Sequence, residues 1–397
     1  MKKLLVIGAG FLQDFVIQKS VLMGYETITV DADPNAIGFS HSHKHALINI
    51  VDEQACLEYA RKEQIDGVLT AATDFGVLSA AYIAQEMKLP GLNYEVAQLI
   101  KNKYRVRKRL YEYRVDDTEQ AYEINLTTDV DKLSNILNYP VMVKPCDGSG
   151  SRGASRVDEP KQLKDACQYA IDASVSNRAE IETFIDGQEY GVESLIVDGQ
   201  IHVLGVMKKW MTEPPFYAEL GHAIPCGLSD QVEKKAKDCV YKAIKALGIN
   251  FGSVNMDLLI TSDGRVYIVD VGARMGGNLI GPCVIPYGTG IDYMGAMIQN
   301  AIGDKVDLCA KKHTAVATKL LAFNAGYVKS LPNMKLLERD FDVEIYHHME
   351  VGMHVNDYHT NLDGCGYVVA KGTSVDEAEH KATCAYEYIK RQAFEVS

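Results

Sequence analysis

The stretch VNMDLLITSDGRVYIVD at residues 254–270 contains two apolar runs separated by Asp-Gly. Asp-Gly between alternating apolar residues is the strongest short-range signal for a β-hairpin. If residues 263–264 form a two-residue loop, the pairing register places Asp257 directly opposite Asp270. The sequence therefore predicts a hairpin that holds two carboxylates side by side.

The opposed carboxylates predict a cation. Directly opposed residues have Cβ atoms about 4.5–5.5 Å apart, and the same register places Leu259 opposite Ile268 on the same face. Two like charges on such an apolar face repel, so one carboxyl stays protonated unless a cation bridges the pair. Mg²⁺ is the expected ion because it binds carboxylates together with nucleotide phosphates. The alternative is a three-residue loop, which would shift the register by one residue and separate the pair.

A glycine-rich loop with phosphate-binding character lies at residues 143–153, VKPCDGSGSRG. Backbone N–H groups in such a loop suit phosphate. The loop lacks the lysine-serine pair of a P-loop, and Lys144 comes instead from the strand before it. A strand-borne lysine under a flexible cover can clamp nucleotide phosphates. The alternative is a plain Gly-Ser linker.

A second glycine turn near the N-terminus permits a different interpretation. Gly8 and Gly10 follow an apolar strand, and Asp31 closes the next strand, as in a dinucleotide-binding unit. Gln13 occupies the third glycine position, where a side chain would crowd the packing of helix on strand. A tight turn in a domain of that topology is therefore favoured. An NAD(P)-dependent oxidoreductase is kept as the alternative function.

The histidines of HSHKH, at positions 41, 43 and 45, would share one face of a strand. A metal site would also need a carboxylate or cysteine held nearby, so a polar loop is favoured over a metal site.

Length, charge and cysteine content limit which classes of protein this chain can belong to. The 397 residues predict two to four domains. The net charge of −12 argues against a nucleic-acid partner, and the basic stretch at 101–114 is expected to be a solvated helix face. No apolar run is long enough for a membrane span. Nine cysteines without a CxxC pair indicate a reduced, cytoplasmic setting.

The order of apolar segments predicts a mixed architecture. Short strands alternate with helix-length segments up to about residue 95, which indicates a doubly wound parallel domain. Residues 179–209 show period-two alternation with Asp-Gly turns at 186–187 and 198–199, which predicts antiparallel sheet. Helices are expected at 160–177, 230–247 and 375–392.

Taken in order, these motifs resemble the ATP-grasp ligase superfamily over essentially the whole chain. The resemblance rests on Lys103, the VKP strand with its glycine loop, ETFIDGQEYGVE at 182–193, the hairpin followed by VGARMGG, and GTGID at 288–292. It implies an α/β and α+β fold: a Rossmann-like domain, a two-part ATP-grasp fold and a small α+β domain. The implied boundaries are 1–95 for the Rossmann-like domain, 96–115 for a basic linker helix, 116–210 for the first lobe with its glycine-rich lid, 211–310 for the second lobe with the metal site, and 311–397 for the C-terminal domain.

The resemblance also implies roles for individual residues. Lys103 and Lys144 would contact ATP phosphates or the adenine edge, together with the loop residues Gly148, Ser149, Gly150, Ser151 and Gly153. Glu182 and the backbone of Thr183, Phe184 and Ile185 would hold adenine, and Glu189 the ribose hydroxyls. Asp257 and Asp270 would hold Mg²⁺, with Mn²⁺ as a possible substitute. Arg274 would steady the transferred phosphoryl group, and His222 would lie near the phosphates and the acceptor.

Two departures from the family pattern concern the metal site. Both carboxylates are aspartates, where the family commonly has glutamate at one or both positions. Gly272 stands where an asparagine usually precedes the arginine, which removes one metal ligand and leaves the number of metal ions open. Substrate choice is expected to lie in 208–227, with Glu219 for a substrate ammonium and Trp210 and Phe216 as apolar walls.

The expected function is an ATP-dependent ligase that phosphorylates a small-molecule carboxylate and transfers the acyl group to an amine. Amino acids, joined as dipeptides, are one possible substrate class. A nucleotide-binding module without catalysis is a further alternative, which the presence of Lys144, Asp257, Asp270 and Arg274 argues against. No nucleic-acid or membrane partner is expected, and a homodimer is possible.

Overall fold

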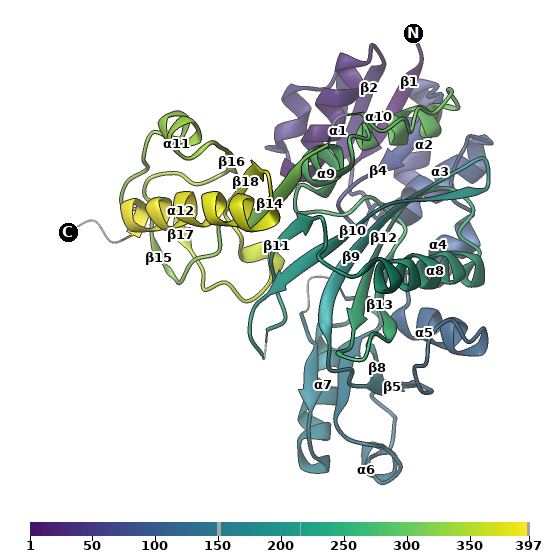
Figure 1. Cartoon of the computed structure of the whole chain (residues 1–397). Coiled ribbons are helices and arrows are strands. Elements are labelled where there is room, and N and C mark those ends of the chain that lie inside the picture. The colour runs from purple at the N-terminus through teal and green to yellow at the C-terminus, as the bar shows by residue number, and fades with distance from the viewer. Residues whose placement is uncertain (149–151, 215, 312, 395–397) are drawn as a thin grey trace.

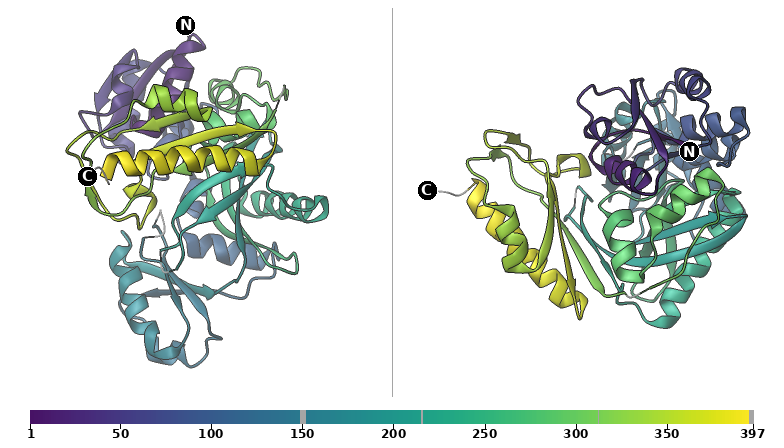
Figure 2. Two further views of the ribbon diagram at one scale, coloured as in Figure 1. Left: turned by 60° about the vertical axis from the view of Figure 1, so that its left-hand side comes forward. Right: turned by 90° about the horizontal axis from the view of Figure 1, so that it is seen from above.

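The computed structural model describes residues 1–148, 152–214, 216–311 and 313–394. Within these residues the strands form an eight-stranded sheet, two four-stranded sheets and a two-stranded sheet. The eight-stranded sheet, called here the large sheet, lies at the centre, with the N-terminal domain, a small lobe around α6 and α7, and the C-terminal part with α12 arranged around it (Figures 1 and 2). The predicted combination of α/β and α+β architecture is confirmed.

The N-terminal domain is a parallel sheet flanked by helices. Its strand order is β3-β2-β1-β4, and the residues of β1 and β4 are almost entirely buried because helices cover both faces. Its elements are β1 (Lys3–Ile7), α1 (Phe11–Leu22), β2 (Glu26–Asp31), η1 (Ile37–Ser40), β3 (Lys44–Leu47), α2 (Glu53–Glu63), β4 (Gly67–Thr70) and α3 (Val77–Met87).

The first glycine turn is filled by the chain's own side chains. Gly8 has a φ of +98°, and a Cβ there would lie 3.3 Å from Cγ of Gln13. Nε2 of Gln13 donates to the carbonyl of Ala71 at 2.7 Å, and Oδ2 of Asp31 accepts from the N–H of Ala9 at 2.8 Å. The groups that would meet a dinucleotide are therefore engaged within the domain. This arrangement argues against an NAD(P)-dependent oxidoreductase that would bind its cofactor at this turn.

Helices α4 (Tyr94–Ile100) and α5 (Lys103–Glu112) connect the N-terminal domain to the rest of the chain. The prediction of a solvated basic helix is only partly right for α5. Arg105 and Lys108 are exposed, whereas Arg107 is 4% exposed. One face of α5 packs on the large sheet and on α8 (Asp230–Leu247), and it carries Arg107 inward.

The small lobe is an antiparallel sheet of order β5-β8-β6-β7. Its elements are β5 (Tyr122–Asn125), α6 (Val130–Ser134), β6 (Val141–Pro145), β7 (Ser155–Val157), η2 (Pro160–Gln162), α7 (Leu163–Ala173) and β8 (Arg178–Thr183). The prediction of one continuous antiparallel sheet over 179–209 is wrong at the first Asp-Gly turn, residues 186–187. Strand β8 pairs with β5 and β6, and the chain then crosses at 184–187 into a different sheet.

The large sheet has the order β13-β12-β9-β10-β11-β14-β18-β16. Its strands are β9 (Gln188–Val197), β10 (Gln200–Met211), β11 (Glu219–Ile224), β12 (Gly252–Ile260), β13 (Val266–Gly272), β14 (Ala315–Leu320), β16 (Val343–His347) and β18 (Gly366–Gly372). Helix α12 (Val375–Phe394) packs on β14 and β18. The remaining elements are η3 (Ile280–Val284), α9 (Ile285–Thr289), α10 (Tyr293–Ile302), β15 (Gly326–Tyr327), α11 (Met334–Phe341), β17 (His354–Val355) and η4 (Asn361–Asp363). The sheet passes without interruption from the expected second lobe into the expected C-terminal domain, and the domain boundaries themselves stay predictions.

The hairpin formed by β12 and β13 confirms one part of the predicted register and corrects another. Asp257 pairs with Asp270, as predicted. Nearer the turn, however, Leu259 pairs with Tyr267 and not with Ile268. The loop has three residues, closed by Thr261, whose N–H donates to the carbonyl of Arg265 at 3.0 Å. A β-bulge next to Asp257 restores the pairing of the two aspartates, so the loop shift does not separate them.

The three alternating histidines do not form a metal site. His41 contacts Asp14 at 2.7 Å, His43 accepts from the N–H of Thr27, and His45 stacks on Phe39. Among the described residues, no group of three or more histidine, cysteine, aspartate or glutamate side chains is arranged to hold a metal. All nine cysteines are free. Within the same residues, no helix is long and apolar enough to cross a membrane.

Candidate active site

A cavity of about 760 Å³ lies where the small lobe, the large sheet and the N-terminal domain meet. The predicted site residues that line it are Lys103, Lys144, Gly148, Glu182, Thr183, Phe184, Ile185, Glu189, His222, Asp257, Asp270 and Arg274. Residues from four of the five motifs, together with His222, therefore come together in one place. Ser149, Gly150 and Ser151 lie outside the described residues.

Gly153 is the described loop residue that does not line the cavity. Its φ is +81°, and a Cβ would lie 2.6 Å from Cβ of Ala173 and 2.6 Å from Cγ of Pro145. The glycine is therefore explained by close packing of the loop on α7 and β6. The predicted nucleotide contact at Gly153 gains no support from this arrangement.

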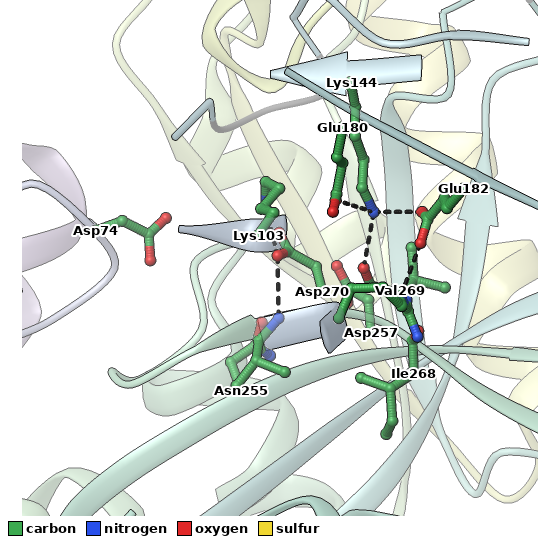
Figure 3. A network of polar contacts seen from close by, with 12 residues as sticks. Asp74, Lys103, Lys144, Glu180, Glu182, Asn255, Asp257, Ile268, Val269 and Asp270 are labelled. Carbon is green, nitrogen blue, oxygen red and sulfur yellow. Dashed lines mark hydrogen bonds and ion pairs between the residues drawn. The ribbon is translucent and has the colours of Figure 1, made fainter. Parts of the chain in front are cut away.

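Lys144 lies at the junction of the small lobe and the large sheet (Figure 3). Its Nζ is 2.6 Å from Oε1 of Glu182 and 3.4 Å from Oε1 of Glu180, and it donates to the carbonyl of Val269 at 3.1 Å. Burial opposes the charge of Lys144, but the two carboxylates outweigh burial and raise its pKa. A fixed ammonium therefore faces the cavity at the end of β6.

Arg107 is a site residue that the sequence analysis missed. Its Nε is 2.8 Å from Oε2 of Glu182, and Nη2 donates to the carbonyl of Ile268. Burial disfavours the charged guanidinium, yet Glu182 and Asp116 outweigh it and raise the pKa of Arg107. The signal was present, because Arg107 follows Lys103 by one helical turn and so shares its face.

The crossing segment between the two sheets lines the cavity next to these cations. Glu182 is the second-to-last residue of β8, and its carboxylate is shared between Lys144 and Arg107. These two cations lower the pKa of Glu182 against the effect of burial. The N–H of Phe184 donates to the carbonyl of Pro140, and the guanidinium of Arg156 lies 4.3 Å from the ring centroid of Phe184. The proposed grip of Thr183–Ile185 on adenine stays a prediction.

The aspartate pair faces the cavity with each carboxylate held by its own lysine. Nζ of Lys209 is 2.9 Å from Oδ1 of Asp257, and Lys103 contacts Oδ1 of Asp270. Within the described residues, no hydrogen bond engages Oδ2 of either aspartate, so two carboxylate oxygens remain available. This donor set fits Mg²⁺, which binds through one or two carboxylates and completes its shell with phosphates and water.

The two aspartates differ in how strongly they hold a proton. Burial raises the pKa of Asp257 to about 6, assisted by the neighbouring Glu219 and Glu189. Burial acts in the same direction on Asp270, but Lys103 and Lys144 outweigh it and lower the pKa to about 2. The expected repulsion between the pair is thus replaced by two separate ion pairs.

The N-terminal domain contributes a carboxylate to the site. Nε and Nη2 of Arg274 contact Oδ1 and Oδ2 of Asp74 at 2.9 and 3.1 Å, and Nη1 lies 3.4 Å from Oδ1 of Asn255. The N–H of Ala72 also donates to the carbonyl of Met275 at 3.0 Å. A bidentate pair fixes the plane of the guanidinium. No sequence motif pointed to Asp74.

Glu193 supports the turn that carries Arg274. This residue is fully buried on β9, and its carboxylate accepts from the N–H of Gly276 at 3.0 Å, from Nδ2 of Asn255 at 2.9 Å and from the hydroxyl of Tyr293 at 2.6 Å. Burial raises the pKa of Glu193 to about 7. A Cβ at Gly276 would lie 3.0 Å from Glu193, so this close approach requires glycine.

His222 and Glu219, both on β11, line the part of the cavity where the sequence predicted the acceptor substrate. His222 is 1% exposed, and its Nδ1 has no hydrogen-bond partner in the described part of the chain. Burial lowers the pKa of His222 to about 4, so the imidazole is neutral at pH 7. Glu219 contacts Lys209 at 2.7 Å and also accepts from Asn278. The carboxylate expected for a substrate ammonium is therefore already engaged by two side chains.

The two predicted apolar walls differ in position. Trp210 lines the cavity and also packs against the hydrophobic core around α12. Phe216 does not line it. Its ring stacks on His359 at 4.0 Å between centroids and is 39% exposed. Asn361, Leu362 and Tyr367 of the C-terminal part line the cavity instead.

The neutral state of His222 predicts a pH dependence of stability. A folded pKa near 4 and an unfolded pKa near 6.5 mean that the unfolded chain binds more protons between these values, so stability falls as pH drops through this window. At pH 5 the cost is about 2 kcal/mol relative to pH 8. Urea unfolding of wild type and His222→Gln at both pH values measures the difference. An equal loss in both proteins would contradict a buried neutral histidine.

Comparison with known proteins identifies the class. Residues 137–282 match the ATP-grasp domain family, and residues 319–392 match L-amino acid ligase C-terminal domain 2. The formate-dependent phosphoribosylglycinamide formyltransferase of Sulfurisphaera tokodaii is 23% identical, over 96% of this chain and 95% of that protein. An uncharacterized protein of Sinorhizobium fredii is 27% identical, over 81% of this chain and 68% of that protein.

Solved structures agree with these matches. The crystal structure of an L-amino acid ligase from Bacillus licheniformis superposes with a TM-score of 0.83 at 22% identity, covering 98% of this chain and 97% of that chain. The chain therefore contains an ATP-grasp domain, and its C-terminal part matches the C-terminal domain of L-amino acid ligases. ATP and Mg²⁺ are the cofactors of this family, and the charges of the cavity fit both.

Proposed function

We propose that the protein joins a small-molecule carboxylate to an amine, with ATP converted to ADP and phosphate. The observation that carries the proposal is the convergence on one cavity of Lys103, Lys144 and Arg274 with the aspartates Asp257 and Asp270. Cations alone would suit any anion. Cations beside two carboxylates with available oxygens suit a nucleotide that arrives with Mg²⁺.

The chemistry requires two balanced steps. A carboxylate oxygen of the first substrate attacks the γ-phosphorus, and the bond from that phosphorus to the ADP oxygen breaks. The amine nitrogen of the second substrate then attacks the carbonyl carbon. Phosphate leaves with the former carboxylate oxygen, and the nitrogen releases a proton. Bound Mg·ATP supplies the phosphoryl group and neutralises its charge.

In both steps, side chains of the protein hold the reacting groups in place and stabilise their charge. Lys144 and Lys103 would hold the phosphates, and Asp257 and Asp270 would hold the metal that neutralises their charge. Arg274, fixed in its plane by Asp74, faces the charge that develops on the phosphoryl and acyl oxygens. His222 is neutral and buried, so it serves as a hydrogen-bonding group near the acyl carbon and not as a resident cation.

Amino acids are the substrates that the C-terminal part favours. The C-terminal domain is of the L-amino acid ligase type, and Leu362 and Tyr367 from it line the cavity. We therefore propose dipeptide formation as the reaction. Nine free cysteines support action in a reducing, cytoplasmic setting, and a homodimer is compatible with the proposal.

The first test is release of ADP in a screen of amino-acid pairs with Mg·ATP. ADP should appear with a matched carboxylate and amine donor and should not appear with ATP alone. The Asp257→Asn variant serves as the inactive control. Pairs of other carboxylates with amines form the second arm of the screen. ADP release in that arm alone would retain the ligase assignment and exclude amino acids.

Ligand-dependent stabilisation gives an independent prediction. Mg·ATP at 100 times its dissociation constant should stabilise the folded protein by about 2.7 kcal/mol, because it binds the folded chain alone. NAD at the same excess should give no stabilisation, since Asp31 and Gln13 are engaged within their own domain. Melting curves with each ligand measure this. Stabilisation by NAD and not by Mg·ATP would contradict the assignment.

A further inference from the structure

One buried lysine touches three carboxylates of the cavity. Nζ of Lys209 lies 2.7 Å from Glu219, 2.9 Å from Asp257 and 3.0 Å from Glu189. Lys209 is 1% exposed, and the carboxylate side chains are between 17% and 24% exposed. These side chains come from β10, β11, β12 and β9, which are adjacent in the large sheet. A single ammonium therefore sits inside a cage of three carboxylates.

The backbone is arranged to let Lys209 reach across a strand. Lys209 lies on β10, whereas Asp257 lies on β12, with β9 between them. Gly191 is the residue of β9 that pairs with Asp257, and a Cβ there would lie 3.7 Å from Cδ of Lys209 and 3.1 Å from Cε of Met207. Glycine weakens the interior of a strand, and it is found where another group must approach closely. The larger side chains common in strands would block the path.

As the chain stands, the ammonium of Lys209 occupies the point between the three carboxylates, and a metal could be held there only in its absence. Three carboxylate oxygens surround one point at 2.7 to 3.0 Å, and Ca²⁺ takes such oxygens at about 2.3–2.6 Å in flexible geometry. With Lys209 replaced by a neutral side chain, a small inward movement of the three carboxylates would bring their oxygens to such distances. The ammonium offsets one of the three negative charges, and its removal would leave a formal charge of −3 that favours a divalent ion.

We propose that Lys209 is a positioning residue that acts as a built-in cation. It fills the cage of Glu189, Glu219 and Asp257, keeps a divalent metal out of that cage, and leaves Asp257 facing the cavity for the metal that arrives with the nucleotide. This inference rests on the proposed function, because that function supplies the metal that arrives with the nucleotide. Through one ammonium, Lys209 also fixes Glu189 and Glu219, which line the same cavity.

Calcium binding to the nucleotide-free protein tests the proposal. In equilibrium dialysis, wild type should bind no stoichiometric Ca²⁺, whereas Lys209→Gln should bind one Ca²⁺ per chain at the same free Ca²⁺ concentrations. Lys209→Gln combined with Glu219→Gln should lose that gain. Lys208→Gln is the matched control, because Lys208 directly precedes Lys209 in β10 and its ammonium lies over the Trp210 ring. It should behave as wild type.

Two outcomes would overturn the proposal: stoichiometric Ca²⁺ binding by wild type, or no gain in Lys209→Gln. If Lys209→Gln melts early without metal, Ca²⁺ should restore its melting temperature, and failure to do so counts against the cage. Ca²⁺ should also inhibit turnover of Lys209→Gln at concentrations that leave wild type and Lys208→Gln unaffected. The dialysis contains no nucleotide, so failure of wild type to bind ATP would defeat the proposed function without changing this result.

Discussion

Asp257→Asn and Asp270→Asn should each lower Mg²⁺-dependent ADP release by about 10³-fold. Each change removes an anionic oxygen that the metal would use, and metal-assisted charge stabilisation contributes several kcal/mol to phosphoryl transfer. The asparagine side chain keeps the size of the original residue. Initial rates at saturating ATP and substrates, over a range of Mg²⁺ concentrations, measure the effect. Asp263→Asn, in the exposed loop of the same hairpin, is the matched control and should retain normal turnover.

The same two variants should differ in stability without ligand. The folded pKa of Asp257 lies near 6, above its unfolded value near 3.8, so ionisation costs folding free energy as pH rises through this window. A neutral amide at this position avoids that cost, and the Asp257→Asn protein should be as stable as wild type or more so at pH 7. Asp270 has a lowered pKa and contacts Lys103, but it is 42% exposed, so Asp270→Asn should lose about 1 kcal/mol or less.

Urea unfolding of the ligand-free variants at pH 7 separates this account from a packing role. If the aspartates serve packing, both variants should be clearly less stable and the folded fraction should retain activity. Near-normal turnover in both variants would place the metal elsewhere in the protein.

Arg274→Met should lower turnover by about 10³-fold while the apparent KM for Mg·ATP changes little. An arginine that stabilises charge in the phosphoryl-transfer transition state contributes about 10³–10⁵ to the rate. Lys103 and Lys144 remain to hold the ground-state phosphates. Arg274→Lys should recover only part of the loss, because an ammonium cannot reproduce the bidentate contact with Asp74.

The control for this prediction is Arg265→Met, which alters an exposed arginine next to the loop of the same hairpin and should retain activity. Asp74→Asn provides a second comparison. Because it frees the guanidinium without removing it, turnover should fall less than in Arg274→Met. A rise in the KM for ATP with unchanged kcat in Arg274→Met would assign Arg274 to ground-state binding instead.

The sequence predicted those parts of the fold and site that depend on local pattern. The helix at 230–247 begins and ends at the predicted residues, since Ser229 caps its start and Gly248 its end. The pairing of Asp257 with Asp270 was predicted correctly although the loop has three residues, because a β-bulge compensates for the shift. Local alternation could not reveal that bulge.

The parts that were missed depend on contacts between distant segments. Asp74 reaches Arg274 across 200 residues, and Glu193 reaches Tyr293 across 100. Lys209 follows another lysine in the sequence, and only the strand order of the large sheet shows that it faces three carboxylates. The division of 179–209 between two sheets was missed for the same reason. A period-two pattern identifies strands but does not say which strand lies beside which.

The transfer of oxygen from carboxylate to phosphate tests the central claim most directly. The carboxylate substrate identified by the ADP screen is labelled with ¹⁸O in both oxygens and converted with Mg·ATP and the amine, and the released phosphate is examined by mass spectrometry. The account predicts one ¹⁸O atom in each phosphate, because the acylphosphate oxygen leaves with phosphorus when the amine attacks. Unlabelled phosphate beside a labelled amide product would contradict activation by phosphoryl transfer.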